Sequence, residues 1–520
     1  MPLPYCKWLR RKAQTVKIDG YSIKICTNNR TIVSCDEFSA PQNKVTFLFG
    51  ESGIGKSLLC KALYGLIDPE ELDVTVNAKP YSVHLNNDAT KNIFNDSFFV
   101  FQEPSSHLNP LMRIGEQICE GSLYKTGTGR DILRRLWQTS DDSVIDKILT
   151  IYPKPYRPSG GEKQRVLLAM AFEKIDIFIK ALSAGKTSSH RRSLFVFDEP
   201  TGSLDNNYRN IFLDLLFEKY SILPFTIMFI THDYSIISEI YNHHEKHIPH
   251  IYFSELSRIS DDGKVEQHDF SPQEYLEWLE VSAPPSYTSA ADRKEVLHVD
   301  PSFSIFGNSH RICSDSLRKH ETPLVINSGE MVYIKAASGV GKTTLAKIIM
   351  GLYKPDIFSM QLSGISLTNN TPLPVWARCI WGKKAGMVFQ HADESLDFEA
   401  NILETFNGLK NGGFQGADKI KSAMSQLFDA SQITGSFLKR KTAYLSGGQK
   451  QRLNLLRTLV LSTDLIILDE PLNGLDFKGV KRVLCLLETI RKQEKAILLI
   501  SHNEEIFDKL IDADHTYYLS

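Results

Sequence analysis

The sequence contains the same ordered series of short motifs twice, and this repeat constrains its fold more than any other feature. Each series begins with a glycine-rich loop that ends at a lysine, Lys56 or Lys342. A glutamine, a Ser-Gly-Gly tripeptide, an Asp-Glu pair and a histidine follow in that order. The spacings agree, because Gln102 lies 46 residues after Lys56 and Gln390 lies 48 residues after Lys342. We therefore expect two domains of one kind, joined head to tail.

The length and the local composition suggest where these domains meet. A chain of 520 residues suits two domains of roughly 250 residues each. A Pro/Ser-rich stretch after residue 280 has the composition of a linker. We place the first domain at residues 1–280, the linker at 281–295 and the second domain at 296–520.

One segment differs in length between the copies. Ser159 and Asp198 are 39 residues apart, whereas Ser446 and Asp469 are 23 residues apart. The additional residues fall around 173–192, and the polar run at 183–192 favours an exposed loop, so we expect a solvated surface insertion. A partner-docking element is the alternative interpretation.

Charge and composition are those of an ordinary soluble globular protein. The balance of 60 basic against 61 acidic residues gives no global sign of binding to nucleic acid or to a membrane surface. No apolar run reaches the ~18–20 residues of a membrane-spanning helix, and no signal-peptide pattern opens the chain. The eight cysteines form no C-x-x-C pair, which favours reduced thiols. We expect a cytoplasmic protein that reaches membranes through partners.

Each glycine-rich loop follows a short apolar run and precedes a helical pattern. Backbone N–H groups in such a loop bind phosphate, the lysine reaches the β/γ-phosphates, and the following hydroxyl suits Mg²⁺. The predicted ATP contacts are Gly50, Glu51, Ser52, Gly53, Gly55, Lys56 and Ser57, and Ala337, Ser338, Gly339, Gly341, Lys342 and Thr343. The second loop begins with Ala336 in place of a glycine, which is tolerable only if that position keeps a negative φ.

An Asp-Glu pair ends an apolar strand in each copy, and a histidine ends the next strand. The pairs are Asp198-Glu199 and Asp469-Glu470, and the histidines are His232 and His502. Open α/β sheets bind their ligands at such strand ends. The aspartate is predicted to hold Mg²⁺, and the glutamate is predicted to polarise the attacking water as a general base. Each histidine is predicted to contact the γ-phosphate.

Together these residues resemble the ATP-binding-cassette family, in which they correspond to the Walker A lysines, the Walker B pairs and the switch histidines. Gln102 and Gln390 are similar to its Q-loop glutamines, and residues 202–205 and 473–476 to its D-loops. Its signature resembles Ser159, Gly160 and Gly161 in the first copy and Ser446, Gly447, Gly448 and Gln449 in the second.

The resemblance implies an α/β fold with two P-loop NTPase domains in tandem. Each would have a mainly parallel core sheet, an antiparallel β subdomain and a helical signature subdomain. It implies Glu199, Glu470, His232, His502, Gln102 and Gln390 as catalytic residues, and Ser57, Gln102, Asp198, Thr343, Gln390 and Asp469 as Mg²⁺ ligands.

The family also implies that two ATP molecules are held between the domains. Site 1 would join the first phosphate loop and Glu199 to the signature at 446–448, and site 2 would join the second loop and Glu470 to the signature at 159–161. Because both copies carry the glutamate and the histidine, we expect two competent sites.

The sequence offers a candidate adenine platform in one copy only. The family stacks adenine on an aromatic side chain that precedes the core strand. No aromatic residue stands at 25–27 in the first copy, so its platform stays unassigned. Phe306 is the candidate in the second copy, with a core phenylalanine as the alternative.

The segment after Gln102 is similar to that of ATPases from oligopeptide, dipeptide and nickel importers. It includes the Leu-Asn-Pro run at 108–110, which the second copy lacks. The resemblance implies two unlike integral-membrane permease subunits, an indirect link to a solute-binding protein, no nucleic acid, and a peripheral position on the cytoplasmic face of the cell (inner) membrane. The alternative is a soluble ATPase of this family that acts on ribosomes or nucleic acid. The short linker and the lack of a cysteine-rich zinc module favour the importer.

Overall fold

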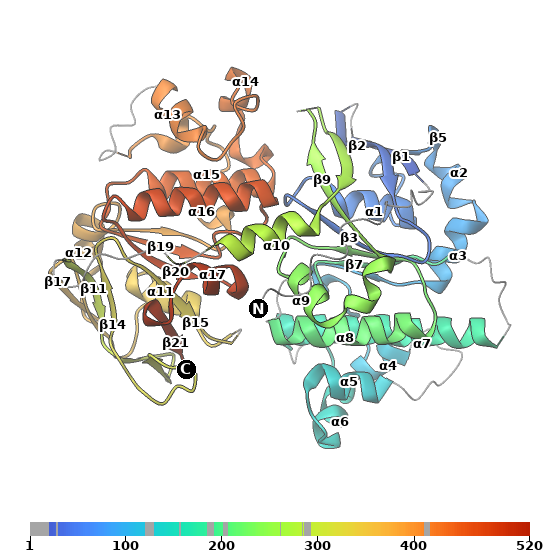
Figure 1. Cartoon of the computed structure of the whole chain (residues 1–520), viewed down its shortest axis with the longest axis horizontal. Coiled ribbons are helices and arrows are strands. Elements are labelled where there is room, and N and C mark those ends of the chain that lie inside the picture. Colours follow the sequence, from blue (N-terminus) through green and yellow to red (C-terminus); the bar gives the residue numbers. More distant parts are fainter. Residues whose placement is uncertain are drawn as a thin grey trace, which may run out of the picture.

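The computed structural model describes residues 20–27, 30–119, 129–154, 158–184, 192–200, 206–260, 262–282, 284, 293–337, 339–409 and 417–520. They form two lobes side by side (Figure 1), which we call the first half, up to residue 282, and the second half, from residue 293. Most of the predicted linker lies outside the described residues. No described helix combines the length and the apolarity that crossing a membrane requires.

A parallel core sheet lies at the centre of each half, and the strand order is the same in both. In the first half the order is β9 (Ile251–Arg258), β3 (Val45–Gly50), β8 (Ile227–Ile230), β7 (Phe195–Asp198) and β6 (Phe99–Val100). In the second half it is β21 (Thr516–Leu519), β15 (Met331–Lys335), β20 (Ala496–Ile500), β19 (Leu465–Asp469) and β18 (Ala385–Val388). The central strands are buried on both faces, which explains their continuous apolar sequences.

Further strands, mostly in antiparallel pairs, extend each core. Among the described residues of the first half they complete one ten-stranded sheet through β10 (Lys264–Asp269), β2 (Arg30–Ser39), β1 (Gly20–Thr27), β4 (Asp73–Val76) and β5 (Lys79–Pro80). In the second half the hairpin of β12 (Ser302–Ile305) and β13 (Asn308–Cys313) joins β21. A separate sheet contains β14 (Leu324–Asn327), β11 (Glu295–Val299), β16 (Ser359–Leu362) and β17 (Ile365–Thr368). The expected fold class is confirmed.

Corresponding helices follow the corresponding strands. The matched pairs are α1 (Lys56–Tyr64) with α11 (Lys342–Ile349), α7 (Gly160–Ser183) with α15 (Gly447–Leu459), α8 (Asn206–Ile222) with α16 (Phe477–Arg491), and α9 (Ile236–His243) with α17 (Glu504–Leu510). Four further helices stand outside these pairs: α2 (Tyr81–Leu85), α3 (Asp88–Asp96), α10 (Pro272–Val281) and α12 (Leu373–Val375).

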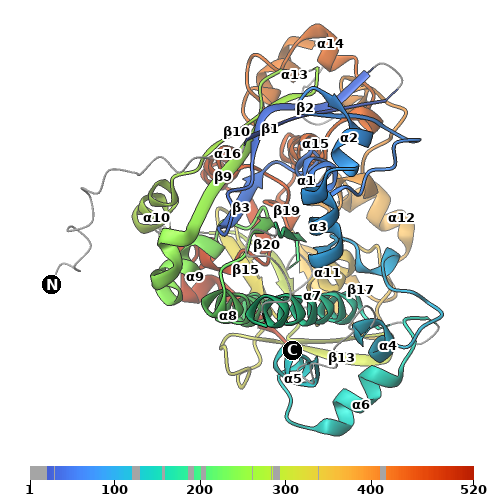
Figure 2. The ribbon, with the colours of Figure 1, turned by 90° about the vertical axis from the view of Figure 1, so that its right-hand side faces the viewer.

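Short helices form an outer subdomain ahead of each signature. They are α4 (Ile114–Cys119), α5 (Gly129–Trp137) and α6 (Asp142–Thr150) in the first half, and α13 (Ala417–Met424) and α14 (Gly435–Leu438) in the second. Figures 1 and 2 show these groups at opposite ends of the molecule, so the halves face each other head to tail. Helix α10 lies where the lobes meet (Figure 1).

The extra segment of the first half is partly helical, where we expected a surface loop. Helix α7 continues through Ser183, and it buries Ile175, Phe178 and Ile179 in the core of the first half. Phe178 and Ile179 follow Ile175 by three and four positions, so all three lie on one face of the helix. The solvated surface insertion is therefore wrong for residues 173–183, and the predicted loop at 183–192 begins where this helix ends. Residues 185–191 lie outside the described part of the chain.

Candidate functional site

The first phosphate loop connects β3 to α1 with a backbone that needs glycine. Gly50, Gly53 and Gly55 have φ values of 133°, 76° and 115°. A methyl group on Gly50 would lie 2.6 Å from the carbonyl oxygen of Leu256 on the neighbouring strand β9. The buried Lys56 ammonium donates hydrogen bonds to the Gly50 carbonyl at 2.6 Å and to the Glu51 carbonyl at 3.0 Å. The loop is thus curled around its lysine, as a phosphate-binding loop requires.

The second loop reaches a similar shape with an alanine at its start. Gly339 and Gly341 have φ values of 84° and 113°, whereas Ala336 lies outside the positive-φ region. Ala336 therefore satisfies the requirement for a negative φ under which its methyl group is tolerable. Lys342 donates to the Ala336 carbonyl at 2.6 Å, as Lys56 does to Gly50. Ser338 lies outside the described residues.

An aspartate ends a core strand beside each loop hydroxyl. Ser57 Oγ donates to Asp198 Oδ1 at 2.9 Å. Burial raises the pKa of Asp198 and of Asp469 to about 6. Within the described part of the chain, both carboxylate oxygens of Asp469 are buried without a protein hydrogen bond of normal geometry. Hard oxygen ligands that lack protein donors suit a divalent cation, so these residues fit Mg²⁺.

The two Walker B glutamates share an uncommon backbone conformation. Glu199 and Glu470 have φ values of 47° and 51°. Few residues other than glycine adopt positive φ, and those that do are concentrated at functional sites. In each half this conformation follows directly after the core strand that ends with the aspartate.

The surroundings of the two glutamates differ. Glu199 Oε1 lies 3.1 Å from Nδ1 of His232, and its Oε2 accepts a hydrogen bond from Gln102 Nε2 at 2.8 Å. Burial alone would raise the pKa of Glu199, but the charge of His232 and these contacts lower it to about 2. The same ion pair raises the pKa of His232 against the opposing effect of burial. The first half therefore brings all three predicted residues together.

Glu470 is buried to 2% exposure and has weaker partners. Its Oε2 accepts hydrogen bonds from Ser501 Oγ at 3.0 Å and from the backbone N–H of His502 at 3.1 Å. The His502 ring is farther away, with Nε2 3.6 Å from Oε1. Burial dominates and raises the pKa of Glu470 to about 7. The pKa values of the two equivalent glutamates are therefore shifted in opposite directions.

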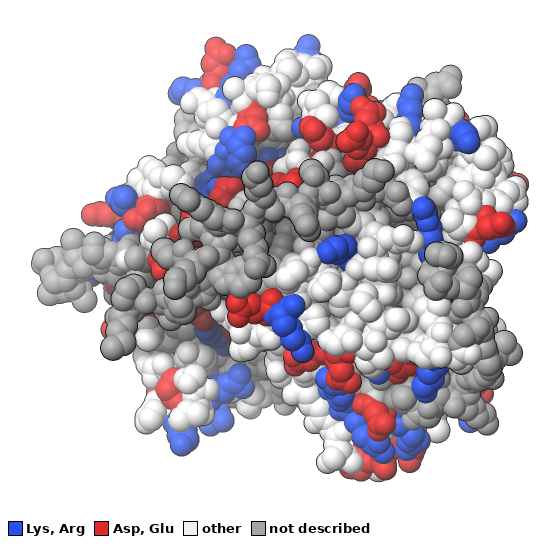
Figure 3. Space-filling model, turned by 45° about the vertical axis from the view of Figure 1, so that its right-hand side comes forward, with Lys and Arg blue, Asp and Glu red and all other residues white. Residues whose placement is uncertain are grey.

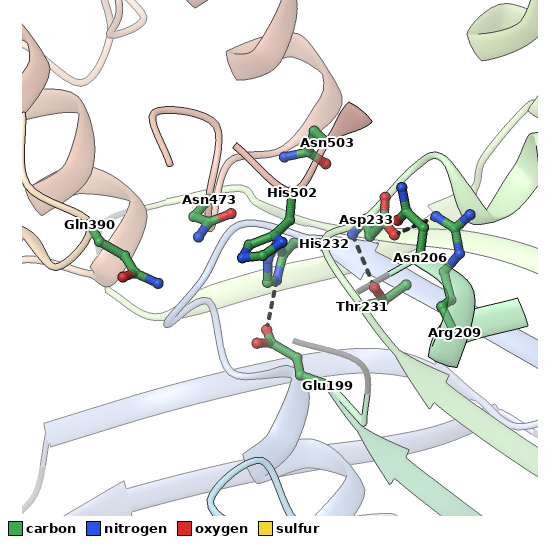
Figure 4. Close-up of a pocket in the computed structure, with 10 residues that line it drawn as sticks. All are labelled: Glu199, Asn206, Arg209, Thr231, His232, Asp233, Gln390, Asn473, His502 and Asn503. Carbon is green, nitrogen blue, oxygen red and sulfur yellow. Dashed lines mark hydrogen bonds and ion pairs between the residues drawn. The ribbon is translucent and has the colours of Figure 1, made fainter. Parts of the chain in front are cut away.

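A pocket between the halves brings several of these residues together (Figure 4). The first half contributes Glu199, Asn206, Arg209, Thr231, His232 and Asp233, and the second contributes Gln390, Asn473, His502 and Asn503. Gln102 is exposed and lies beside Glu199, whereas Gln390 lines the pocket. Both predicted histidines thus face a space that the two halves share.

The second signature lies directly on the first phosphate loop. Ser446 caps α15, and its Oγ donates to Glu51 Oε1 at 3.1 Å. The N–H of Gly448 donates to the Ser52 carbonyl at 3.3 Å, and a methyl group on Gly447 would lie 2.9 Å from Ser52 Oγ. The structure thus brings together the two predicted components of site 1. The Gln449 side chain is used locally, because it accepts the Ser446 N–H in the helix cap.

Among the described residues, no corresponding hydrogen bond joins the components of site 2. Ser159 caps α7 with Glu162 in the same way that Ser446 caps α15. A methyl group placed on Gly160 or on Gly339 would have no neighbour within 4 Å among the described residues. The first signature and the second loop therefore do not touch through these glycines.

Phe306 occupies the turn between β12 and β13 and is 75% exposed. Its ring meets Tyr353 edge to face at 6.1 Å. The alternative of a core phenylalanine is therefore wrong. In the first half the equivalent turn, between β1 and β2 at residues 28–29, lies outside the described residues.

Several residues at the junction of the halves were missed by the sequence reasoning. Arg452 Nη2 donates to Glu51 Oε1 at 2.8 Å, and the Gly474 carbonyl accepts the Ser52 N–H at 2.8 Å. Phe477 of the second half is buried in the core of the first. A usable signal was the acid in the first phosphate loop, which the second loop lacks. The first D-loop, at residues 202–205, lies outside the described residues.

Several known proteins resemble this chain in sequence over most of its length. A protein-family model described as "ABC transporter" matches residues 34–179 and 320–473. The chain is 27% identical to "Uncharacterized ABC transporter ATP-binding protein YejF" of Escherichia coli (strain K12), over 91% of this chain and 88% of the relative. It is 26% identical to "Peptidoglycan transport ATP-binding protein YejF" of Agrobacterium fabrum, over 95% and 89%. It is 24% identical to "Glutathione import ATP-binding protein GsiA" of Salmonella paratyphi A, over 91% and 79%.

Solved structures resemble the whole chain at low sequence identity. A structure titled "RNase-L Inhibitor" superposes with a TM-score of 0.59 at 16% identity and covers 95% of this chain and 89% of its own. A complex containing the archaeal ribosome recycling factor aABCE1 gives a TM-score of 0.57 at 15% identity, with 94% and 87% covered. These likenesses show the tandem fold.

Proposed function

This chain belongs to the ABC transporter family, and we propose that it is the ATP-hydrolysing subunit of an importer for peptides, nickel or a similar small solute. Proteins of this kind are ATPases, and the two halves supply both ATP-binding cassettes in one polypeptide. The observation that carries the proposal is the contact of Ser446 and Gly448 with the first phosphate loop. It supports an ATP site shared between the halves.

We assign the steps of hydrolysis to residues of both halves. Lys56 and Lys342 bind the β/γ-phosphates, and the signature N–H and hydroxyl groups complete the cage around the γ-phosphate. Mg²⁺ would be held by the loop hydroxyl and the strand-end aspartate, with the Q-loop glutamine alongside, and would neutralise phosphate charge. Glu199 and Glu470 accept a proton from the attacking water, and His232 and His502 hold the γ-phosphate.

The proposed importer role is supported by two further features. The relatives YejF of Agrobacterium fabrum and GsiA are named for peptidoglycan transport and glutathione import. The importer-like segment after Gln102 presents Leu111 at 84% exposure, while Leu108 and Asn109 anchor it to the protein. We propose that this exposed apolar side chain, on a segment fixed by its neighbours, contacts a membrane subunit. The chain would then be peripheral on the cytoplasmic face of the membrane, with two unlike permease subunits.

The rival function on ribosomes or nucleic acid has less support. Lys and Arg are interspersed with Asp and Glu on the face shown in Figure 3, whereas nucleic-acid binding requires a continuous basic surface. The likeness to ribosome-associated structures concerns the fold.

Affinity purification from detergent-solubilised cells tests the proposal. We expect two polytopic membrane proteins to co-purify with the chain, and Leu111→Asp to abolish their recovery. Ile222→Asp is the matched control, because Ile222 is also an exposed apolar residue but lies at the end of α8. Recovery of ribosomal subunits in place of membrane proteins contradicts the importer role.

A further inference from the structure

The two halves are joined by an aromatic contact beside site 1. Phe477, the first residue of α16, is 3% exposed and lies among side chains of the first half. Its ring centroid is 5.4 Å from those of Tyr234 and Trp278 and 5.7 Å from those of Phe270 and Tyr275. We call these four first-half residues the aromatic socket. It excludes water from a side chain of the opposite half, which gives a strong contact.

The aromatic socket is continuous with the catalytic elements of the first half. Tyr234 follows the switch histidine by two residues and stacks on Phe49 at 4.6 Å, and Phe49 is the residue before the first phosphate loop. On the other side, Phe477 directly follows the second D-loop, whose Gly474 carbonyl accepts the Ser52 N–H at 2.8 Å. Phe477 therefore fixes the second D-loop against the first phosphate loop.

Polar contacts surround this aromatic contact. Helix α10 of the first half bonds to the second half twice: Tyr275 Oη donates to Glu505 at 3.1 Å, and Glu274 pairs with Lys481 at 2.8 Å. The nearly buried pair of Glu51 and Arg452 lies at site 1 itself. Protein groups supply both partners in each contact, so none of them depends on a nucleotide bridging the halves.

The equivalent positions around site 2 carry different residues. Asn206 begins α8 where Phe477 begins α16, and a short amide cannot fill an aromatic socket. Ala337 stands in the second loop where Glu51 stands in the first. Arg165, the counterpart of Arg452, lies 4.5 Å from the rings of Trp137 and Tyr208 in its own half.

We propose that Phe477 is a fixed pivot that keeps the halves in contact at site 1 throughout the ATPase cycle, so that they open and close at site 2. Phe477 is a positioning residue, because it acts through the second D-loop and touches no nucleotide. When ATP enters site 1, it takes the place of the Glu51 side chain as the hydrogen-bond partner of Ser446. Phe477 stays in the aromatic socket during this exchange. ATP entering site 2 draws in the first signature, which makes no contact with the second loop through Gly160 or Gly339 among the described residues. This inference rests on the proposed pair of shared ATP sites.

Distance measurements across the two sites test the pivot. Nitroxide labels can be attached through a ketone-bearing unnatural amino acid, which leaves the native cysteines in place. The pair Asp68 and Lys439 spans site 1, the pair Ser140 and Lys354 spans site 2, and all four residues are exposed. Pulsed electron paramagnetic resonance then gives each distance without nucleotide, with ADP, and with Mg²⁺ and a non-hydrolysable ATP analogue.

We expect the distance across site 2 to shorten with the ATP analogue and the distance across site 1 to keep one narrow distribution. Phe477→Ala should broaden the site 1 distribution and make it respond to nucleotide, and Phe477→Trp should restore the narrow one. Phe94→Ala, which removes a 56% exposed phenylalanine on α3, is the matched control and should change neither distance.

Steady-state ATP turnover of the same samples separates the possible failures. A protein that hydrolyses ATP while both distances change equally, or while neither changes, overturns the pivot and leaves the proposed ATPase function intact. A protein that neither binds nor hydrolyses ATP refutes the proposed function, and the pivot with it.

Discussion

Replacing each Walker B glutamate by glutamine should change the stability of the protein in opposite directions. A tenfold change in proton affinity corresponds to about 1.4 kcal/mol. The pKa of Glu470 rises from 4.5 to about 7 because the group is buried, so keeping it ionised at pH 8 costs the folded state up to about 3 kcal/mol. Glu470→Gln removes this cost, and we expect it to stabilise the second half at pH 8.

The pKa shift of Glu199, and with it the effect on stability, has the opposite sign. Its pKa falls from 4.5 to about 2 through its contacts with His232 and Gln102, so the ionised group stabilises the folded state above pH 4.5 by up to about 3 kcal/mol. Glu199→Gln removes that stabilisation and leaves His232 buried without its counter-charge. We therefore expect the first half to unfold at a lower temperature in this variant.

Thermal unfolding of the protein without nucleotide, followed by calorimetry, checks both signs. For domains of this size 1 kcal/mol shifts Tm by roughly 2–4 °C, so each variant should move by up to about 10 °C at pH 8. The gain in Glu470→Gln should shrink as the pH falls from 7 towards 4.5 and vanish below 4.5, where Glu470 is protonated in the folded and the unfolded protein alike. Shifts of the same sign in both variants at pH 8, or a gain at pH 5 as large as the gain at pH 8, would refute the reasoning.

Two further predictions concern backbone shape and the junction between the halves. Gly50→Ala should abolish ATP binding at site 1, because its methyl group would meet the Leu256 carbonyl oxygen at 2.6 Å. Ala336→Gly should leave ATP binding at site 2 unchanged, because Ala336 lies outside the positive-φ region. Titration with a fluorescent ATP analogue measures both effects, and equal effects would contradict the φ argument. Phe477→Ala should weaken the contact between the halves by about 3–5 kcal/mol and lower Tm, whereas Phe94→Ala should shift Tm little; equal shifts would contradict the burial of Phe477.

Much of this architecture could be predicted from the sequence because short local patterns of residues encode it. Parallel core strands are apolar along their whole length, and glycine-rich loops and acidic pairs stand at their ends. Residues 45–50 and 465–469 are examples. The repeat then assigned the same order to both halves.

Contacts between the halves could not be predicted in this way. An apolar residue at the start of a helix, such as Phe477, fits the core of its own domain equally well, so its pattern does not reveal its socket. The different pKa values of Glu199 and Glu470 depend on burial and on the distance of a histidine ring, which identical Asp-Glu motifs do not encode. The helical residues after 172 had a detectable signal in their apolar spacing, but polar neighbours obscured it.

ATP turnover in the Glu199→Gln/Glu470→Gln double variant tests the central claim most directly. The claim is that two shared sites hydrolyse ATP with these glutamates as bases. We expect each single variant to bind ATP but turn it over slowly, and the double variant to hold ATP in a closed form with no measurable phosphate release. Phosphate release at the wild-type rate from the double variant would contradict the account.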